Sequence, residues 1–117
     1  MTNIDIEALR RLKEVIGGDS EDLQELMDDF CDIAPDLVAQ IVSACSAHDL
    51  GALKIASHTL KSNSRDLGAI ELGELSARIE AASQSGDETD LDLLCAPAQD
   101  LLNSAIVALK EIKPDDV

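Results

Sequence analysis

Aromatic residues are almost absent from this chain, which has one phenylalanine and neither tryptophan nor tyrosine among its 117 residues. Alanine, leucine and isoleucine must therefore fill the core, and such a composition favours packed helices over a sheet sandwich. Proteins that bind single-stranded nucleic acid stack the bases on aromatic side chains, and Phe30 alone cannot provide that surface.

Basic residues are scarce as well. The 9 Lys and Arg residues stand against 24 Asp and Glu residues, which gives a net charge of −15. The phosphates of a nucleic acid would be repelled by that charge, so we expect no nucleic-acid partner. The hydrophobic fraction of 45% indicates a folded chain, and its length suits one domain, over residues 1–117.

Cysteine pairs and long apolar runs are missing too. Cys31, Cys45 and Cys95 are odd in number and lack a CxxC spacing, which argues against a disulfide framework or a zinc site and fits a reducing cytoplasm. The sequence has no paired Glu-x-x-His motifs for a metal in a bundle core. No segment approaches the roughly 20 apolar residues of a membrane span, and the N-terminus lacks the features of a signal peptide. We expect a cytoplasmic protein that binds neither metal nor membrane.

The stretch LKIASHTLKSNSRDL, residues 53–67, divides into two faces when it is read as an α-helix at about 100° per residue. One face carries the 3- and 4-residue steps of a buried seam, formed by Leu53, Ala56, Leu60 and Leu67. His58 falls roughly opposite this seam, so its side chain is predicted to point outward.

Basic side chains gather around His58 although they are rare in the chain. Three fall on its face of the helix: Lys54, Lys61 and Arg65. Residues 50–65 contain no acidic residue, and Ser62, one turn beyond His58, is small. The other histidine, His48, lies beside Asp49 in a predicted turn and lacks such neighbours, so we interpret it as a surface or capping residue. A lone surface histidine is most often only solvated, but an outward imidazole ringed by cations suits a nucleophile that carries a negatively charged group.

Helical periodicity extends over most of the chain. The predicted elements are a short N-terminal lid helix over about 3–17, capped by Thr2 or Asn3; a long helix from Asp19 or Ser20 to about Ala47, kinked or split at Pro35; the helix of His58, from Asp49 to Gly68; a helix from about Ala69 to Ser85; and a last helix from Thr89 or Asp90 to Ile112, kinked or broken at Pro97. Residues 113–117 are predicted to be a frayed tail. The pattern predicts an all-α fold, an antiparallel up-down-up-down four-helix bundle over about 20–112 with an additional short N-terminal helix.

For two of these helices, the sequence also predicts where individual side chains lie. In the long helix, Leu26, Phe30 and Ile33 are expected to reach the lid helix or to border a partner surface, with ordinary core as the alternative. In the helix over 69–85, the predicted buried stripe is Ile70, Leu75, Ile79 and Ala82, and the residues expected on its other faces are Glu71, Glu74, Arg78 and Glu80.

The run His58-Thr59-Leu60-Lys61-Ser62-Asn63-Ser64, followed by Leu67-Gly68-Ala69, resembles the signature of histidine-containing phosphotransfer (HPt) domains. That signature reads roughly His-x-x-Lys-Gly-x-(Ser/Ala), with Gly-Ala a few residues further on. The resemblance extends from about Ser20 to Ile112, because the helix lengths and the position of the motif also agree. Ser62 stands where the family usually has glycine; serine is small enough to be tolerated, with an altered partner preference or transfer rate.

The resemblance implies a phosphorelay intermediate. His58 would accept a phosphoryl group from the aspartate of a receiver domain, or from a hybrid sensor histidine kinase, and pass it to another response-regulator receiver. Lys61 would neutralise the phosphoryl oxygens, and Lys54, Ser62 and Arg65 would lie on the partner surface. The family often has Gln or Glu one helix over in contact with the ring, which here is Glu80; the sequence leaves a solvated carboxylate equally open.

The resemblance also implies no cofactor of the protein's own, since the receiver supplies Mg²⁺, and a monomer is expected. The chain has no Gly-rich loop or Walker motif, so it is not expected to be an enzyme with its own nucleotide. The alternative is a catalytically silent helical-bundle adaptor that binds a signalling partner; the presence of both His58 and Lys61 argues against it.

Overall fold

The computed structural model describes residues 4–117, and over that range the chain is helical with no strand, which confirms the predicted class. The elements are α1 (Ile6–Val15), α2 (Ser20–Ser46), α3 (Leu50–Asp66), α4 (Ile70–Ser85), α5 (Leu91–Cys95), α6 (Ala98–Lys110) and a 3-10 helix η1 (Pro114–Asp116). They form an elongated bundle with extents of 44 × 25 × 20 Å.

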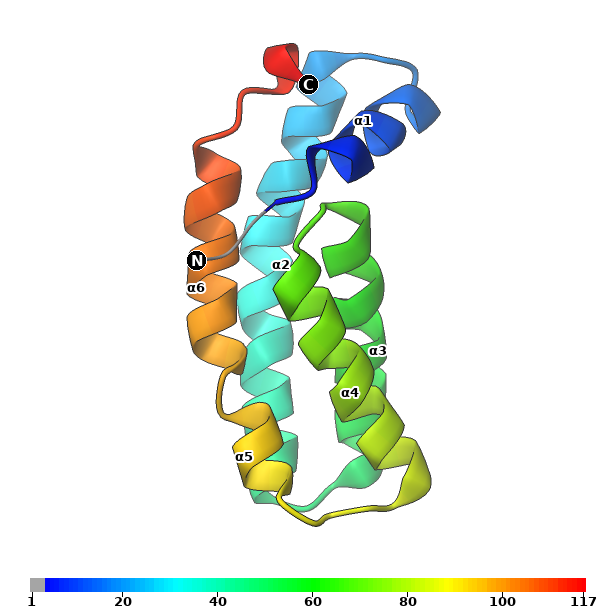
Figure 1. The fold of residues 1–117 in the computed structure, drawn as a ribbon, viewed down its shortest axis with the longest axis vertical. Coiled ribbons are helices and arrows are strands. Elements are labelled where there is room, and N and C mark those ends of the chain that lie inside the picture. Colours follow the sequence, from blue (N-terminus) through cyan, green and yellow to red (C-terminus); the bar gives the residue numbers. More distant parts are fainter. Residues whose placement is uncertain (1–3) are drawn as a thin grey trace.

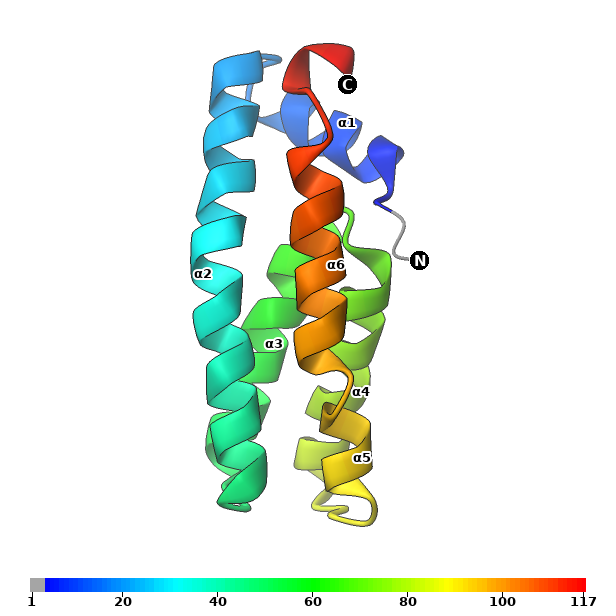
Figure 2. The same cartoon turned by 90° about the vertical axis from the view of Figure 1, so that its left-hand side faces the viewer.

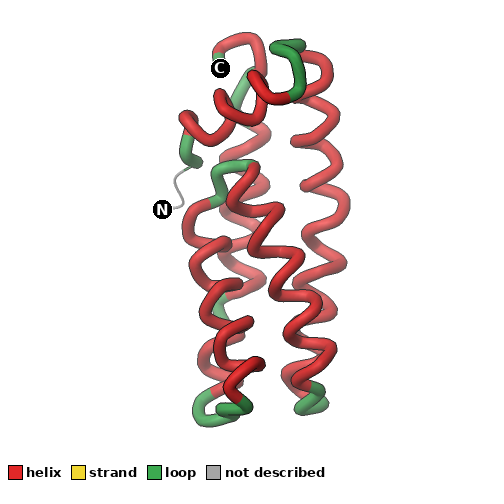
Figure 3. Tube along the Cα trace, turned by 90° about the vertical axis from the view of Figure 1, so that its right-hand side faces the viewer, coloured by secondary structure: helices red, strands yellow, loops and turns green. Residues whose placement is uncertain are grey.

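The long helices alternate in direction (Figure 1): α2 descends, α3 rises, α4 descends, and α5 with α6 rises again. Figure 2 shows α2 and α6 side by side, with the α3–α4 hairpin behind them. Apart from the break between α5 and α6, the loops gather near the ends of the helices (Figure 3). The result is an up-down-up-down bundle with α1 lying across the end where α3 turns into α4 (Figure 1).

The two prolines inside predicted helices behave differently. Pro35 lies within α2 and does not end it, so α2 is one element rather than two. Pro97 instead separates α5 from α6. Proline cannot donate a backbone hydrogen bond, and its ring collides with the carbonyl of residue i−4. Of the two alternatives for the last helix, a kink or a break, the structure shows the break.

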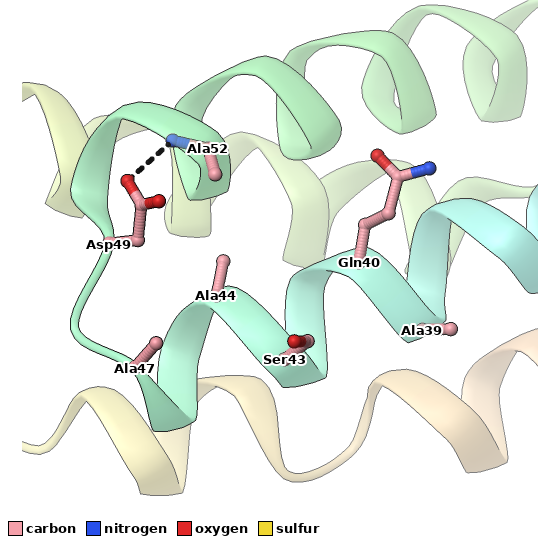
Figure 4. A pocket seen from close by; sticks show the side chains of 7 residues that line it. All are labelled: Ala39, Gln40, Ser43, Ala44, Ala47, Asp49 and Ala52. Atoms are coloured by element: carbon pink, nitrogen blue, oxygen red, sulfur yellow. Dashed lines mark hydrogen bonds between the residues drawn. The ribbon is translucent and has the colours of Figure 1, made fainter.

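Aspartate side chains begin the first three helices. Asp5, Asp19 and Asp49 each accept a hydrogen bond from a backbone N–H in the first turn. Figure 4 shows the bond from the Ala52 amide to Asp49. Asp49 was predicted correctly. The cap predicted for the first helix was wrong, because α1 starts after Asp5; Thr2 and Asn3 themselves lie outside the described residues.

The turn between α3 and α4 anchors the segment that leads into α1. The Asp5 amide donates to the Gly68 carbonyl at 2.8 Å, and Ile4 pairs with Ala69 as an isolated β-bridge. Gly68 has a φ of +76°, and a Cβ atom there would lie 2.5 Å from the Asp5 carbonyl oxygen. Glycine is therefore required both by the left-handed backbone and by the close approach of the N-terminal segment.

Leucine, isoleucine and alanine dominate the core, as the composition indicated. The seam predicted for the His58 helix is confirmed, since Leu53, Ala56, Leu60 and Leu67 are buried. In α4, Leu75 and Ile79 are buried as predicted, whereas Ile70 is 43% exposed and Leu72 takes the inward position. Ile70 and Leu72 lie about 200° apart around the helix, so Ile70 faces outward when Leu72 faces inward.

The predicted frayed tail is wrong. Pro114–Asp116 forms η1, and the Lys13 ammonium of α1 donates to the Pro114 carbonyl at 2.8 Å and to a Val117 oxygen at 3.2 Å. A lysine distant in sequence satisfies these carbonyls, which a local sequence pattern cannot reveal.

We predict that Gly68→Ala destabilises the protein more than Gly86→Ala. Both glycines have a positive φ, so each alanine carries the left-handed cost of about 1–2 kcal/mol. Nothing lies within 4 Å of a Cβ at Gly86, whereas Gly68 also meets Asp5 and should lose about 1–3 kcal/mol more. Urea unfolding of both variants measures the difference; equal losses would contradict the close approach.

Candidate functional site

His58 lies near the middle of α3 and points outward, with its side chain 60% exposed. The neighbouring Ser57 is fully buried, and its hydroxyl donates to the Leu53 carbonyl one turn back at 2.7 Å. The helix therefore fixes the backbone of His58 while leaving the ring open to a partner.

Glu80 of α4 joins His58 to Lys61. Its Oε2 atom lies 2.5 Å from His58 Nδ1, and its Oε1 atom accepts from Lys61 Nζ at 2.5 Å. The Glu80 side chain is only 10% exposed and that of Lys61 21%. Helical periodicity placed Glu80 on an outer face of its helix, and that prediction was wrong. Of the two alternatives left open for Glu80, the contact with the ring is the one observed.

The bond to Glu80 selects the tautomer of a neutral His58. An ionised carboxylate can only accept hydrogen bonds, so Nδ1 must carry the proton. Nε2 then holds the lone pair, and no side chain in the described part of the chain bonds to it. The arrangement presents one defined nitrogen as a nucleophile.

The pKa of Glu80 is held below its ordinary value of 4.5. The largest cause is the hydrogen bond from Lys61; the bond from His58 adds to it, and burial opposes both. Glu80 is therefore an anion at neutral pH, with the Lys61 ammonium and the His58 ring as its partners.

The other predicted site residues lie outside this cluster. Lys54, Ser62 and Arg65 are exposed residues of α3, and among the described residues none of them bonds to His58 or Glu80. Arg65 lines a hollow with Asp5 and Arg11, beside α1. The structure thus brings together His58, Lys61 and Glu80 and leaves the remaining three as surface groups.

One residue of this face was missed from the sequence. Ile55 lies one turn before His58, and its apolar side chain is 70% exposed on the same side of the helix. Its position on the outward side of the helix was the available signal. The second histidine behaves as interpreted: His48 lies at the other end of α3, where its Nδ1 is 2.7 Å from Glu88 Oε1 and both side chains are exposed.

Two further surface hollows lie beside α3. One, of about 240 Å³, lies where α1, α2 and α3 meet and is lined by Leu12, Leu26, Asp29, Phe30, Ile33, Asn63, Asp66 and Leu67. Leu26, Phe30 and Ile33 therefore line one hollow together with Leu12 of α1, and Phe30 is at the same time a buried core residue, which was the alternative expectation. The other, of about 400 Å³, lies between the end of α2 and the start of α3 (Figure 4). None of the predicted site residues lines it.

Residues 4–117 contain no group of three or more His, Cys, Asp or Glu side chains placed to hold a metal ion. None of the helices in that range combines the length and the hydropathy needed to cross a membrane.

Fold and site together define a class: helical bundles that hold a histidine on an outer face through an acidic residue of the adjacent helix. The chain belongs to the Hpt domain family, whose model matches residues 25–111. A solved structure, histidine-containing phosphotransfer protein B from Pseudomonas aeruginosa PAO1, is similar in fold, with a TM-score of 0.83 and 20% identity over 97% of this chain and 96% of that one. No curated protein matches the chain. Family membership gives the chain a histidine phosphotransfer role in two-component signalling, and proteins of this family are phosphocarriers.

We predict that Glu80 stabilises the fold at neutral pH and loses this effect in acid. Because the pKa of Glu80 is lowered on folding, its contribution is present above the ordinary value of 4.5 and disappears as the pH falls through the lower folded value. Urea unfolding of the parent and of Glu80→Gln, compared from pH 7 to pH 3, measures it. The stability difference should shrink with falling pH; a difference that stays constant would contradict the two bonds.

Proposed function

We propose that the protein is a phosphorelay intermediate in which His58 accepts a phosphoryl group from a receiver-domain aspartate, or from a hybrid kinase, and passes it to another response-regulator receiver. The observation that carries this proposal is the exposed ring of His58, whose Nδ1 is held by Glu80 and whose Nε2 is left without a bond from the described residues. Membership of the Hpt domain family supports it.

The imidazole ring neither gains nor loses a proton during the transfer of the phosphoryl group. The Nε2 lone pair attacks the phosphorus of the aspartyl phosphate, the N–P bond forms, and the P–O bond breaks with its electron pair leaving on the receiver carboxylate. The Nδ1 proton stays on the ring, which becomes a cation paired with Glu80. The reverse step regenerates the neutral ring, so one geometry serves both acceptance and donation.

The remaining residues of the face suit a docking partner. Lys61 is close enough to the ring to offset the charge of phosphoryl oxygens, while the exposed Lys54 and Arg65 are placed to attract an acidic receiver. Ser62 and Ile55 are exposed one turn either side of His58 and would lie under the partner. The receiver supplies the Mg²⁺, so this chain needs no cofactor of its own.

In this role residues 1–117 would act as one domain, as a monomer and in the cytoplasm. Three free cysteines support a reducing compartment. The sequence match over residues 25–111 leaves α1 outside the matched region, although α1 is joined to the bundle through Asp5 and Lys13.

We predict that His58→Gln abolishes phosphate acceptance while the fold is retained, because glutamine has no nucleophilic ring nitrogen. The assay incubates the parent, His58→Gln and the matched control His48→Gln with a panel of phosphorylated receiver domains. The parent and His48→Gln should gain an acid-labile, alkali-stable phosphate, and His58→Gln should stay at background.

Acceptance by His58→Gln would show that another residue carries the phosphate. If the folded parent accepts from no receiver in the panel but still binds one, the adaptor interpretation replaces the relay.

A further inference from the structure

The charge of the Glu80 carboxylate must be compensated by neighbouring groups, because the side chain is largely buried. Its carboxylate is nine-tenths buried, and an ionised carboxylate taken out of water is costly unless a cation or hydrogen bonds compensate it. Its two oxygens are bonded to two different donors, Lys61 Nζ and His58 Nδ1, each at 2.5 Å. Only Lys61 of these two is a permanent cation.

Without Lys61, the charge of Glu80 would be balanced by the other donor. A carboxylate in contact with an imidazole favours the doubly protonated, cationic ring. Such a ring has a proton on Nε2 as well as on Nδ1, so it has no lone pair with which to attack phosphorus. The neutral ring that phosphoryl transfer requires therefore depends on how Glu80 is neutralised.

The charged groups around His58 leave Lys61 as the main counter-ion of Glu80. On α3, Lys54 and Arg65 share the outward face with His58 and do not contact Glu80. On α4, the other charged residues, Glu71, Glu74 and Arg78, lie roughly 120° or more around the helix from Glu80. On α2, the charged residues within the span facing α3 are all exposed aspartates, and none of them bonds to His58 or Glu80. They are Asp28, Asp29, Asp32 and Asp36.

We propose that Lys61 acts on His58 through Glu80: by neutralising this buried carboxylate it keeps the imidazole uncharged and nucleophilic before the phosphoryl group arrives. Lys61 is in this respect a positioning residue, and its role is separate from any direct contact with phosphoryl oxygens. The inference rests on the proposed function of His58, but it concerns the resting state of the free protein and can be measured there.

The first test follows the ring of His58 by NMR during a pH titration of the free protein. Lys61→Gln should move the midpoint of the ring's titration to higher pH than in the parent, because Glu80 then holds the cationic ring. Lys61→Gln/Glu80→Gln should remove this rise. Lys54→Gln removes the same charge from the same face without touching Glu80, so it should move the midpoint upward less than Lys61→Gln does.

The second test measures phosphate acceptance from a phosphorylated receiver as a function of pH. For each unit by which the midpoint rises, the neutral fraction of the ring at pH 7 falls by up to about tenfold. Lys61→Gln should therefore accept slowly at pH 7 and recover as the pH rises, and the double variant should accept several-fold faster than Lys61→Gln at pH 7.

Two results would overturn the inference: an unchanged ring titration in Lys61→Gln, or a double variant that accepts no faster than Lys61→Gln at pH 7. Either would mean that Lys61 acts only on the phosphoryl group. If Lys61→Gln folds poorly, Lys61→Met takes its place, because it keeps the apolar stem of the side chain, removes the charge and should raise the ring's midpoint in the same way. Acceptance by the parent, with none by His58→Gln, tests the proposed function separately.

Discussion

The close packing of α3 against α4 is the constraint on which the site depends. Gly73 of α4 is buried against α3, and a Cβ atom there would meet the side chains of Ser64 and Arg65 at ordinary contact distances of 3.6 and 3.4 Å, so the two helices lie in direct contact. Ser57 and Ser76 are buried along the same helices, and each hydroxyl donates to a carbonyl of its own helix. Among the described residues, the buried Ser64 hydroxyl of α3 has no hydrogen-bond partner. This proximity lets one carboxylate of α4 reach two side chains of α3.

The residue that orients the histidine and the histidine itself differ in their exposure to solvent. The carboxylate that orients the ring is almost buried, whereas the ring itself is more than half exposed. A buried charge is tolerated because its two oxygens each have a donor, and the low exposure makes those bonds less sensitive to solvent. In a chain with a net charge of −15, the basic side chains on this face create a local region suited to a phosphoryl group.

Sequence periodicity predicted the helical class, the helix of His58 and its buried seam, because apolar spacing and capping residues are local signals. It misplaced Glu80 and the C-terminal segment for one common reason. A glutamate is expected on a solvated face, and a short polar tail is expected to fray, unless a distant lysine compensates them. Lys61 compensates Glu80, and Lys13 binds the carbonyls of Pro114 and Val117. Pairings of this kind depend on how helices pack, which spacing within one helix does not encode.

The most direct measurement of the central claim is the tautomer of His58 in the free protein, determined by long-range ¹H–¹⁵N correlation of the imidazole at a pH where the ring is neutral. The hydrogen bond to Glu80 predicts a protonated Nδ1 and a bare Nε2 in the parent, and a loss of this preference in Glu80→Ala. A parent ring that carries its proton on Nε2, or that exchanges equally between both tautomers, would contradict the account, because Glu80 would then not hold the nucleophile in place.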